Sequence, residues 1–312
     1  MGEFPLLFPQ AAARRLDPHL PSFASPASPS LPFVTLTFAT SLDSALSLGP
    51  GIRTALSGPQ SKAMTHYIRS RHDAICVGVG TAIADDPGLN CRIATTAHPP
   101  DYSPGVDTAS VGALLGLASL RTGEAGISEA DNIFTSHQPR PVVIDPGLRW
   151  DFTPDTKVMR LAKAGSGLAP YIITAVSDPP PDKRKLLEEL GGKYIVLTQL
   201  RGGGAGAGPA SRRRFDWRSI LTTLRGEGLQ SIMVEGGGEV INSLLSRENS
   251  SLVDSVIVTI APTWLGQGSV FVAPPRTPNP DGQLKPVARL TSTTWLPLGN
   301  DVVLCGRIAT QA

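Results

Sequence analysis

The sequence predicts a single α/β domain in which a mostly parallel sheet is flanked by helices. Short apolar runs alternate with segments that repeat apolar residues at helical spacing, a pattern typical of βαβ units. The clearest case is 231–245, where an apolar strand runs through three glycines into an amphipathic helix. Without three segments of biased composition, roughly 220 residues are left, which suits one domain.

These three segments are expected to lie outside the core. Residues 1–31 are rich in proline, serine and alanine and predict a disordered or loosely held N-terminal arm, because such a composition cannot offset its ordering entropy. Residues 97–140 and 201–214 are low-complexity stretches expected to be surface insertions or mobile loops. The folded domain is therefore expected to span 32–312.

The first predicted strand is 32–39, where β-branched and aromatic residues alternate with small ones. A turn-rich loop at 41–54 follows, and Ser57-Gly58-Pro59-Gln60 then begins a helix with proline in its first turn. Residues 73–80 are an apolar run bounded by glycine, which predicts a buried strand ending in a turn at Thr81. The opening unit is therefore strand, helix, strand.

The remaining elements continue this alternation. Further strands are predicted at 141–145, 171–176, 194–198, 231–235, 255–261 and 301–308, and further helices at 181–190, at 217–227 and after the glycines. Ligands of such sheets bind beyond the carboxyl ends of the strands. Thr81, Asp85 and the glycine run all follow strands, so we expect them to meet in one crevice.

The glycine run Gly236 to Gly238 predicts a phosphate cradle. Glycines let backbone N–H groups approach an anion, and the following helix adds unpaired donors. A tight turn that packs the helix on the sheet is an equally good interpretation. The spacing differs from the G-x-G-x-x-G fingerprint, so a standard Rossmann domain is not supported. Glu235 would be repelled by phosphate and is assigned to an organic part of the ligand.

Composition argues against several classes of protein. A net charge of +2 is too small for a nucleic-acid binder. Cys76, Cys91 and Cys305 are too few and too scattered for a disulfide framework or a zinc site. No apolar run has the length of a membrane span, and the start resembles neither a signal nor a transit peptide, so a cytoplasmic protein is expected. No metal site and no nucleophilic triad are predicted, and His66 and His72 are interpreted as helix-surface residues.

Charged side chains cluster near the expected crevice. The turn-rich loop from Thr81 to Arg92 combines a hydroxyl, two carboxylates and an arginine. Arginine forks fit phosphate bidentately, so Arg69 and Arg92 are candidates for a substrate phosphate. From the residues alone, two ordinary surface arginines are the favoured interpretation.

The chain resembles the reductase family of riboflavin biosynthesis. The resemblance extends over somewhat more than half of the chain and rests on motifs in family order: Phe33-Val34-Thr35-Leu36 with Ser41-Leu42-Asp43, Met64-Thr65-His66-Tyr67-Ile68-Arg69 with Asp73-Ala74-Ile75, Gly78-Val79-Gly80-Thr81 with Ala84-Asp85-Asp86-Pro87-Gly88-Leu89-Asn90-Cys91, Val234-Glu235-Gly236-Gly237, Ala261-Pro262 with Leu265-Gly266, and Asp301-Val302-Val303-Leu304-Cys305. The resemblance implies a dihydrofolate-reductase-like fold, usually as a homodimer. It also implies NADPH-dependent reduction of the ribosylamino group of 2,5-diamino-6-ribosylamino-4(3H)-pyrimidinone 5′-phosphate to a ribitylamino group.

Site residues follow from the same resemblance. The residues implied to contact NADPH are Ala39, Thr54, Thr81, Asp85, Gly236, Gly237, Gly238, Glu239 and Val240, with the run continuing to Ser243. Those implied to hold the phosphorylated substrate are Arg69, Leu89, Arg92 and Glu235. Asp43 is a candidate proton donor, or else a residue that organises its loop. Ser44 stands where the family often has glycine, and Gly238 occupies a position that varies.

Two other functions are compatible with these residues. A dihydrofolate reductase would share the fold and cofactor, but the two arginines and Glu235 favour a phosphorylated ribose. A non-catalytic nucleotide-binding regulatory protein would bind NADPH without turning it over. The sequence has no H-x-E with P-C-x-x-C pair, so nucleobase deaminase chemistry is not expected.

Overall fold

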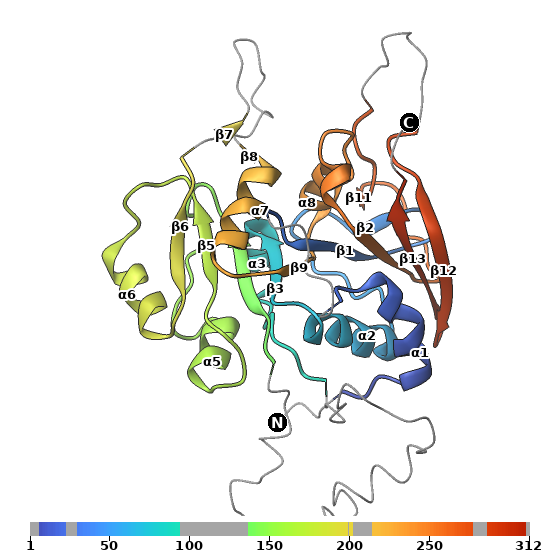
Figure 1. Ribbon diagram of the computed structural model, residues 1–312, viewed down its shortest axis with the longest axis horizontal. Helices are drawn as coiled ribbons and strands as arrows, with labels where there is room; N and C mark the ends of the chain where they lie inside the picture. Colours follow the sequence, from blue (N-terminus) through green and yellow to red (C-terminus); the bar gives the residue numbers. More distant parts are fainter. Residues whose placement is uncertain are drawn as a thin grey trace, which may run out of the picture.

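The computed structural model describes residues 6–22, 30–93, 137–198, 200–201, 214–276 and 286–309. Their main feature is a nine-stranded sheet in the order β12-β13-β10-β1-β9-β3-β4-β5-β6 (Figure 1). From β10 to β6 all neighbouring strands are parallel, while β13 runs antiparallel to β10 and β12 antiparallel to β13. The predicted mostly parallel α/β sheet is therefore confirmed.

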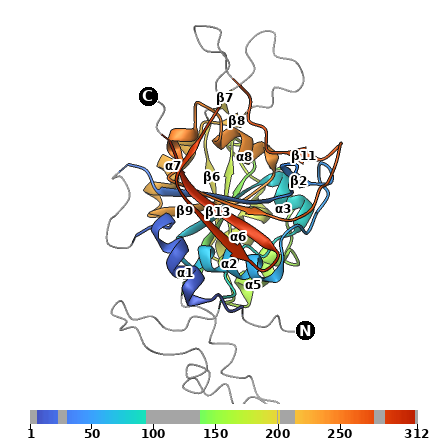
Figure 2. The same ribbon diagram turned by 90° about the vertical axis from the view of Figure 1, so that its right-hand side faces the viewer.

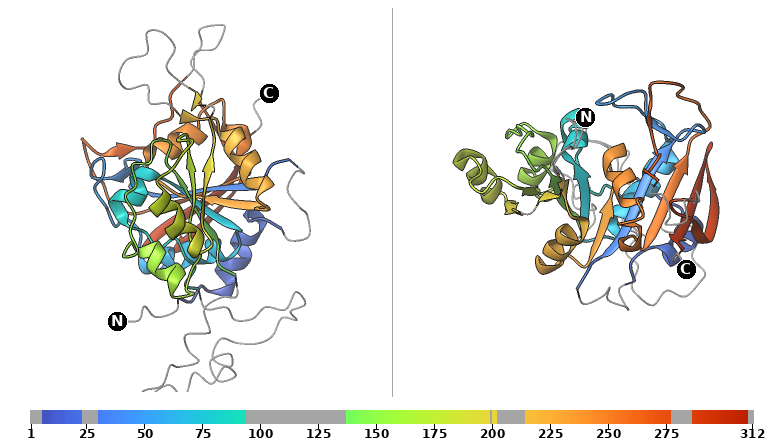
Figure 3. Two further views of the ribbon diagram at one scale, coloured as in Figure 1. Left: turned by 90° about the vertical axis from the view of Figure 1, so that its left-hand side faces the viewer. Right: turned by 90° about the horizontal axis from the view of Figure 1, so that it is seen from above.

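The strands of this sheet match the predicted apolar runs closely. Their bounds are β1 Phe33–Thr40, β3 Ala74–Gly78, β4 Arg140–Ile144, β5 Tyr171–Thr174, β6 Lys193–Val196, β9 Ser231–Val234, β10 Ser255–Ile260, β12 Leu290–Leu298 and β13 Asp301–Ile308. Strand β12, which the sequence did not predict, forms one edge of the sheet. Figure 3 shows the opposite end, where β5 and β6 lie beside α6.

Helices cover both faces of the sheet, as predicted. They are α1 Gln10–Leu16, α2 Pro59–Ser70, α3 Val79–Asp85, α5 Lys157–Lys163, α6 Pro181–Glu189, α7 Trp217–Gly226 and α8 Gly238–Leu244, with short 3₁₀ turns at Asp17–His19 and Ser250–Leu252. Helices α7 and α8 lie on one face and α1 and α2 on the other (Figure 1). Side chains on β3 alternate between the faces, since Cys76 packs beneath α7 and α8 while Ile75 packs with α3, α5 and α6.

Helix α7 illustrates how the sequence determines this packing. Asp216 caps the helix by accepting the backbone N–H of Ser219 at 3.1 Å. Ile220, Leu221 and Leu224 then recur at helical spacing and are buried against the sheet. On the opposite face, α2 is held by His72, whose ring contacts the Ile68 carbonyl and the Thr35 hydroxyl, each at 2.8 Å.

Two short antiparallel ladders lie outside the main sheet. The first, which we call the β2–β11 ribbon, joins β2 Ala45–Ser47 to β11 Val270–Phe271. The second joins β7 Leu200–Arg201 to β8 Arg214–Phe215. The second ladder occupies both ends of the predicted 201–214 insertion, whose remaining residues lie outside the described ranges.

The N-terminal segment differs from the expected loose arm over residues 6–22. Helix α1 buries Ala12, Ala13 and Leu16. Arg71 of the segment after α2 forms a 2.9 Å ion pair with Asp17. Burial of these apolar side chains offsets the loss of conformational entropy that the proline-rich composition led us to expect. The rest of the arm and most of the predicted 97–140 insertion lie outside the described residues, although Arg140 belongs to β4.

Helix α3 is a second correction, because the sequence predicted a strand to residue 80 and then a turn-rich loop. The chain instead leaves β3 at Gly78 and forms a helix from Val79 to Asp85. This places Thr81 and Asp85 on helical turns at the carboxyl end of β3. None of the helices in the described ranges combines the length and apolar character needed to cross a bilayer.

Candidate functional site

Two segments predicted to form the crevice meet at the carboxyl ends of β3 and β9, which are neighbouring parallel strands. The Thr81 hydroxyl on α3 accepts the backbone N–H of Gly237 at 3.1 Å. Just before it, the Glu235 N–H donates to the Cys76 carbonyl at 2.9 Å, which extends the ladder by one bond. The start of α3 and the glycine run are therefore adjacent.

The three glycines of the run serve different purposes. Gly236 has a φ of +153°, a conformation that side chains with a Cβ rarely adopt. A Cβ on Gly238 would lie 2.7 Å from Val270 Cγ1 of β11, so this glycine lets the β2–β11 ribbon pack on α8. Gly237 is exposed, and its nearest atom would be the Thr81 hydroxyl at 3.7 Å. The tight-turn interpretation therefore fits Gly236 and Gly238, while Gly237 leaves an exposed turn without a side chain, whose N–H is donated to Thr81.

Arg69 and Glu235, predicted to hold the substrate, are paired with each other. Arg69 Nη2 lies 2.9 Å from Glu235 Oε2, and Arg69 Nε donates to Oε1 at 3.3 Å. A third N–H of Arg69 donates to the Asn90 carbonyl at 3.1 Å. Both side chains are mostly buried, so their orientations are fixed. The pair brings α2, the end of β9 and the loop after α3 to one place.

Arg92 lies beside His66, which is buried and not at the helix surface as predicted. The backbone N–H of Arg92 donates to His66 Nδ1 at 3.0 Å, and Arg92 Nη2 lies 3.3 Å from Nε2. Burial, followed by repulsion from Arg69, Arg92, Lys62 and Lys157, lowers the pKa of His66 to about 2. His66 is therefore a neutral ring among cations. His72, the other predicted surface histidine, is also fully buried.

Asp43 organises its loop. Its carboxylate accepts the Ser41 hydroxyl at 2.5 Å and the backbone N–H groups of Leu265 and Gly266 at 3.1 and 2.8 Å. The Ser41 hydrogen bond and then the Gly266 N–H lower the pKa of Asp43 to about 2. At neutral pH the carboxylate therefore has no proton to donate. The next residue, Ser44, has a φ of +62°, the conformation that a glycine at this position would favour.

The other predicted residues surround the same edge. Ala39 is the next-to-last residue of β1, and the Thr54 hydroxyl accepts the Leu48 N–H at 3.1 Å within the following loop. Burial raises the pKa of Asp85, and nearby Arg53 partly offsets this effect. Leu89 is buried in the core, so only its backbone is free to meet a substrate.

Helix α8 uses most of its polar side chains to hold its neighbours. Glu239 forms a 3.0 Å ion pair with Arg214 of β8. The Asn242 amide donates to the Phe271 carbonyl at 3.0 Å and accepts the Ala273 N–H at 2.8 Å, which ties the β2–β11 ribbon to the helix. The Ser243 hydroxyl accepts the Trp217 indole N–H at 2.9 Å. Ser243, expected to face the cofactor, therefore faces α7.

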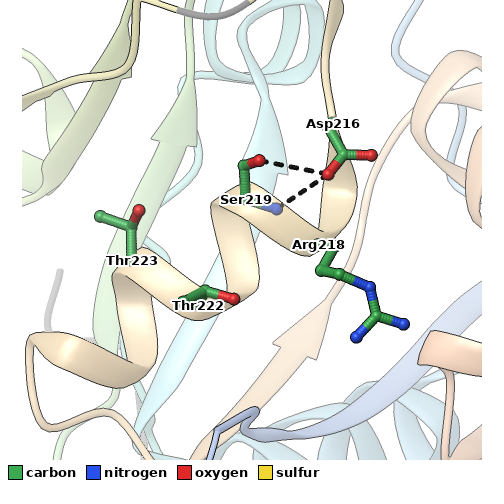
Figure 4. Close-up of a pocket in the computed structure, with 5 residues that line it drawn as sticks. All are labelled: Asp216, Arg218, Ser219, Thr222 and Thr223. Atoms are coloured by element: carbon green, nitrogen blue, oxygen red, sulfur yellow. Dashed lines mark hydrogen bonds between the residues drawn. The ribbon is translucent and has the colours of Figure 1, made fainter.

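A separate depression on α7 contains none of the predicted site residues. It is lined by Asp216, Arg218, Ser219, Thr222 and Thr223, and its carboxylate is engaged in capping the helix (Figure 4). Within the described ranges, no group of three or more His, Cys, Asp or Glu side chains is placed to hold a metal ion.

Sequence reasoning missed His66 and Asn242 as parts of the site. A signal for His66 was available, because Lys62, His66 and Arg69 follow one another at helical spacing on one face of α2. Asn242 gave no comparable signal, since its partners are backbone groups of a strand about thirty residues further on.

Comparison with known proteins places this geometry in context. The model of the RibD C-terminal domain matches residues 32–304. The 2,5-diamino-6-ribosylamino-4(3H)-pyrimidinone 5′-phosphate reductase of Kluyveromyces marxianus is 34% identical over 298 residues, covering 95% of both chains. The reductase of the same name from Saccharomyces cerevisiae is 34% identical over 295 residues, covering 94% of both.

Solved structures agree with the sequence relatives. The S. cerevisiae riboflavin biosynthesis reductase Rib7 aligns with a TM-score of 0.64 and 28% identity, over 96% of this chain and all of that chain. Acinetobacter baumannii RibD aligns with a TM-score of 0.57 and 19% identity, over 90% of this chain and 59% of that chain, which shows a shared fold.

Proposed function

Because the chain belongs to the RibD C-terminal domain family, we propose that it reduces 2,5-diamino-6-ribosylamino-4(3H)-pyrimidinone 5′-phosphate with NADPH. It is an oxidoreductase of riboflavin biosynthesis. The observation that carries the substrate assignment is the close approach of Arg69, Glu235, Arg92 and His66 beside the glycine run. A cationic subsite next to an open glycine backbone suits a phosphorylated sugar placed against a dinucleotide.

On the cofactor side, the chain offers backbone groups. Gly237 is exposed between the fixed glycines Gly236 and Gly238, so a phosphate oxygen can approach this turn without meeting a side chain. The Gly237 N–H itself is donated to the Thr81 hydroxyl. Thr81 adds a hydroxyl at the same point. The carboxyl ends of β1, β9 and β3 lie side by side, so an extended ligand such as a dinucleotide can lie along this edge of the sheet. When bound, the reduced nicotinamide supplies the hydride for the sugar carbon.

On the substrate side, charge decides the assignment. Glu235 balances the positive charge of Arg69. The guanidinium of Arg92 is a second bidentate donor group, beside that of Arg69, for the 5′-phosphate. The Glu235 carboxylate has acceptor capacity beyond Arg69, which suits the hydroxyl or amino hydrogens of the substrate. Its rigid pairing orients these acceptors before the substrate arrives, and such preorganisation favours a reaction that depends on alignment.

Proton delivery falls outside the predicted residues. Asp43 is ionised and its oxygens are engaged by Ser41, Leu265 and Gly266, so it acts by shaping the loop after β1. We assign the proton that balances hydride addition to solvent or to the substrate itself.

The direct test is oxidation of NADPH by the purified protein with enzymatically generated substrate. The deaminated pyrimidine, dihydrofolate and NADH are run in parallel reactions. We expect turnover of the diamino substrate and a lower KM for NADPH than for NADH. Turnover of dihydrofolate alone would show a different reductase, and NADPH binding without turnover of any substrate would show a regulatory protein.

We extend the proposal to a cytoplasmic homodimer. Trp295 and Val302 are 52% and 37% exposed and lie on the same face of β12 and β13, which gives a second copy an apolar surface. The two strands, in red, face the viewer in Figure 2. The three cysteines are free and buried, which suits a reducing compartment. Light scattering should give twice the chain mass, and Trp295→Glu should lower it; a wild-type monomer would refute the dimer.

A further inference from the structure

We infer that the N-terminal segment, residues 6–22, is a positioning element of the substrate site. It holds α2 and the loop 89–92, which we call the substrate loop. The inference rests on the proposed function, because Arg69 of α2 and Arg92 of the loop are the residues assigned there to the substrate phosphate. The segment lies outside residues 32–304, which match the RibD C-terminal domain, so its role does not follow from the family.

The substrate loop has no secondary structure of its own, yet every backbone polar group of its last two residues is hydrogen-bonded. The Cys91 N–H donates to the Gln138 side chain at 2.9 Å, and the Gln138 amide donates to the Cys91 carbonyl at 3.0 Å. The Arg92 N–H donates to His66 Nδ1 at 3.0 Å. The fourth group, the Arg92 carbonyl, accepts the Leu6 N–H at 2.9 Å. The N-terminal segment therefore completes the set of bonds that fix this loop.

Two further contacts show what the loop is fixed against. Leu6 and Ile93 form a parallel β-bridge, so the N-terminal segment and the end of the loop run side by side as neighbouring strands do. From α2, Arg69 Nη1 donates to the Asn90 carbonyl at 3.1 Å. The loop is therefore bonded to α2 through Asn90 and to the N-terminal segment through Arg92. Release of the Arg92 carbonyl would let Arg92 move relative to Arg69.

The N-terminal segment also packs along one face of α2 (Figure 1), where apolar residues of both join a single cluster. Phe8 stacks on Tyr67, with ring centroids 5.1 Å apart. Asp17 accepts the Tyr67 hydroxyl at 2.5 Å and forms a 2.9 Å ion pair with Arg71. Helical spacing places Arg69 on nearly the opposite face of α2. The segment therefore supports the helix from the side away from Arg69.

These contacts fall on elements of the substrate side. Helix α2 and the substrate loop carry residues assigned to the substrate, whereas Thr81 and the glycine run, assigned to NADPH, follow β3 and β9. Loss of a contact from the N-terminal segment should therefore weaken substrate binding and leave cofactor binding unchanged. A segment that only stabilised the fold would affect both ligands or neither.

Leu6 allows a sharp test, because its bond to the Arg92 carbonyl uses the backbone N–H. Leu6→Pro removes this donor, since proline has no N–H. Leu6→Ala keeps the donor and removes most of the side chain. Leu7→Pro places a proline at the adjacent residue, which is 71% exposed, and keeps the Leu6 N–H. The two controls therefore separate the lost hydrogen bond from the lost side chain and from the proline itself.

The three variants and the wild type are compared in five measurements. These are KM and kcat for the phosphorylated substrate, the same constants for its dephosphorylated nucleoside, inorganic phosphate affinity by calorimetry, NADPH affinity and thermal unfolding. We expect Leu6→Pro to raise KM for the phosphorylated substrate about fivefold and to weaken inorganic phosphate binding by a similar factor, as for loss of one hydrogen bond. Its NADPH affinity and its KM for the nucleoside should stay at wild-type values. Leu6→Ala and Leu7→Pro should match the wild type throughout.

Either of two results would overturn the inference. Equal phosphate affinity and substrate KM in Leu6→Pro and Leu7→Pro would show that the bond to Arg92 does not position the site. Equal losses for phosphate and NADPH in Leu6→Pro would make the role of the segment purely structural. If the wild-type protein turns over none of the substrates, the proposed function fails, and the phosphate titrations decide the role of the segment. Absence of phosphate binding in that wild type would overturn both.

Discussion

Substitution of Gly238 by alanine tests how the β2–β11 ribbon packs on α8. The added methyl group would lie 2.7 Å from Val270 Cγ1, closer than side-chain carbons approach one another. Val270 cannot move aside easily, because a β-branched side chain has few rotamers and its strand is tied to α8 through Asn242. The ribbon itself must therefore shift.

The expected cost follows from two opposing contributions. Overpacking of a well-packed site costs about 1–3 kcal/mol. Alanine returns up to about 1 kcal/mol through its higher helix propensity, and less at the first helical position than in the interior. The net loss is therefore about 1–2 kcal/mol. For a domain of this size, that loss lowers the melting temperature by roughly 2–8 °C.

Thermal unfolding measures this loss, with Gly237→Ala as the matched control. The methyl group in Gly237→Ala meets only the Thr81 hydroxyl, at 3.7 Å, and the φ of −71° suits alanine. We expect the control to unfold at the wild-type temperature and to bind NADPH more weakly, since its methyl group narrows the open backbone surface. Val270→Ala should reduce the cost of Gly238→Ala in a double-mutant cycle. Equal melting temperatures for the two alanine variants would refute this account of the glycine run.

Three further substitutions test the site. Arg69→Ala should raise KM for the phosphorylated substrate about tenfold or more and leave NADPH affinity nearly unchanged; an equal loss of NADPH affinity would contradict its assignment. Asp43→Asn should leave the dependence of kcat on pH unchanged above about pH 5, because a carboxyl with a pKa of about 2 is ionised over that whole range. The stabilisation of the loop by Asp43 should be fully present above the ordinary pKa of an aspartate and should be lost as pH falls towards 2. If the wild-type pH profile of kcat has a limb that disappears in Asp43→Asn, Asp43 is a proton donor after all. Asn242→Leu should weaken NADPH binding and expose the β2–β11 ribbon to proteolysis, and unchanged protease sensitivity would show that the ribbon is held by other contacts.

The sequence predicted the strands well where burial on both faces makes the apolar run continuous, as in β3 and β9. It failed at α3, whose seven residues are too few to show a helical period and follow directly from a strand. Strand β12 was missed because Pro297 breaks the pattern, and a proline is tolerated there since β12 is the edge of the sheet.

The site could be predicted only in part, for a related reason. Motif order identified Arg69, Arg92 and Glu235, but their pairings join residues far apart in sequence. Arg69 and Glu235 are 166 positions apart, so no local pattern reveals that one neutralises the other. The neutral state of His66 likewise depends on charges that converge only in the folded chain.

The strand order has a consequence for how the chain folds. Strands β3 to β6 follow one another in sequence and are neighbours, so this half of the sheet can form early. Strand β1 pairs instead with β9 and β10, and Thr35 in β1 lies opposite Ser255 in β10. Because closing such long loops slows folding, the centre of the sheet should form last, after most of the chain has been synthesised. Until then, β1 is an unpaired apolar strand that chaperones would have to shield from aggregation.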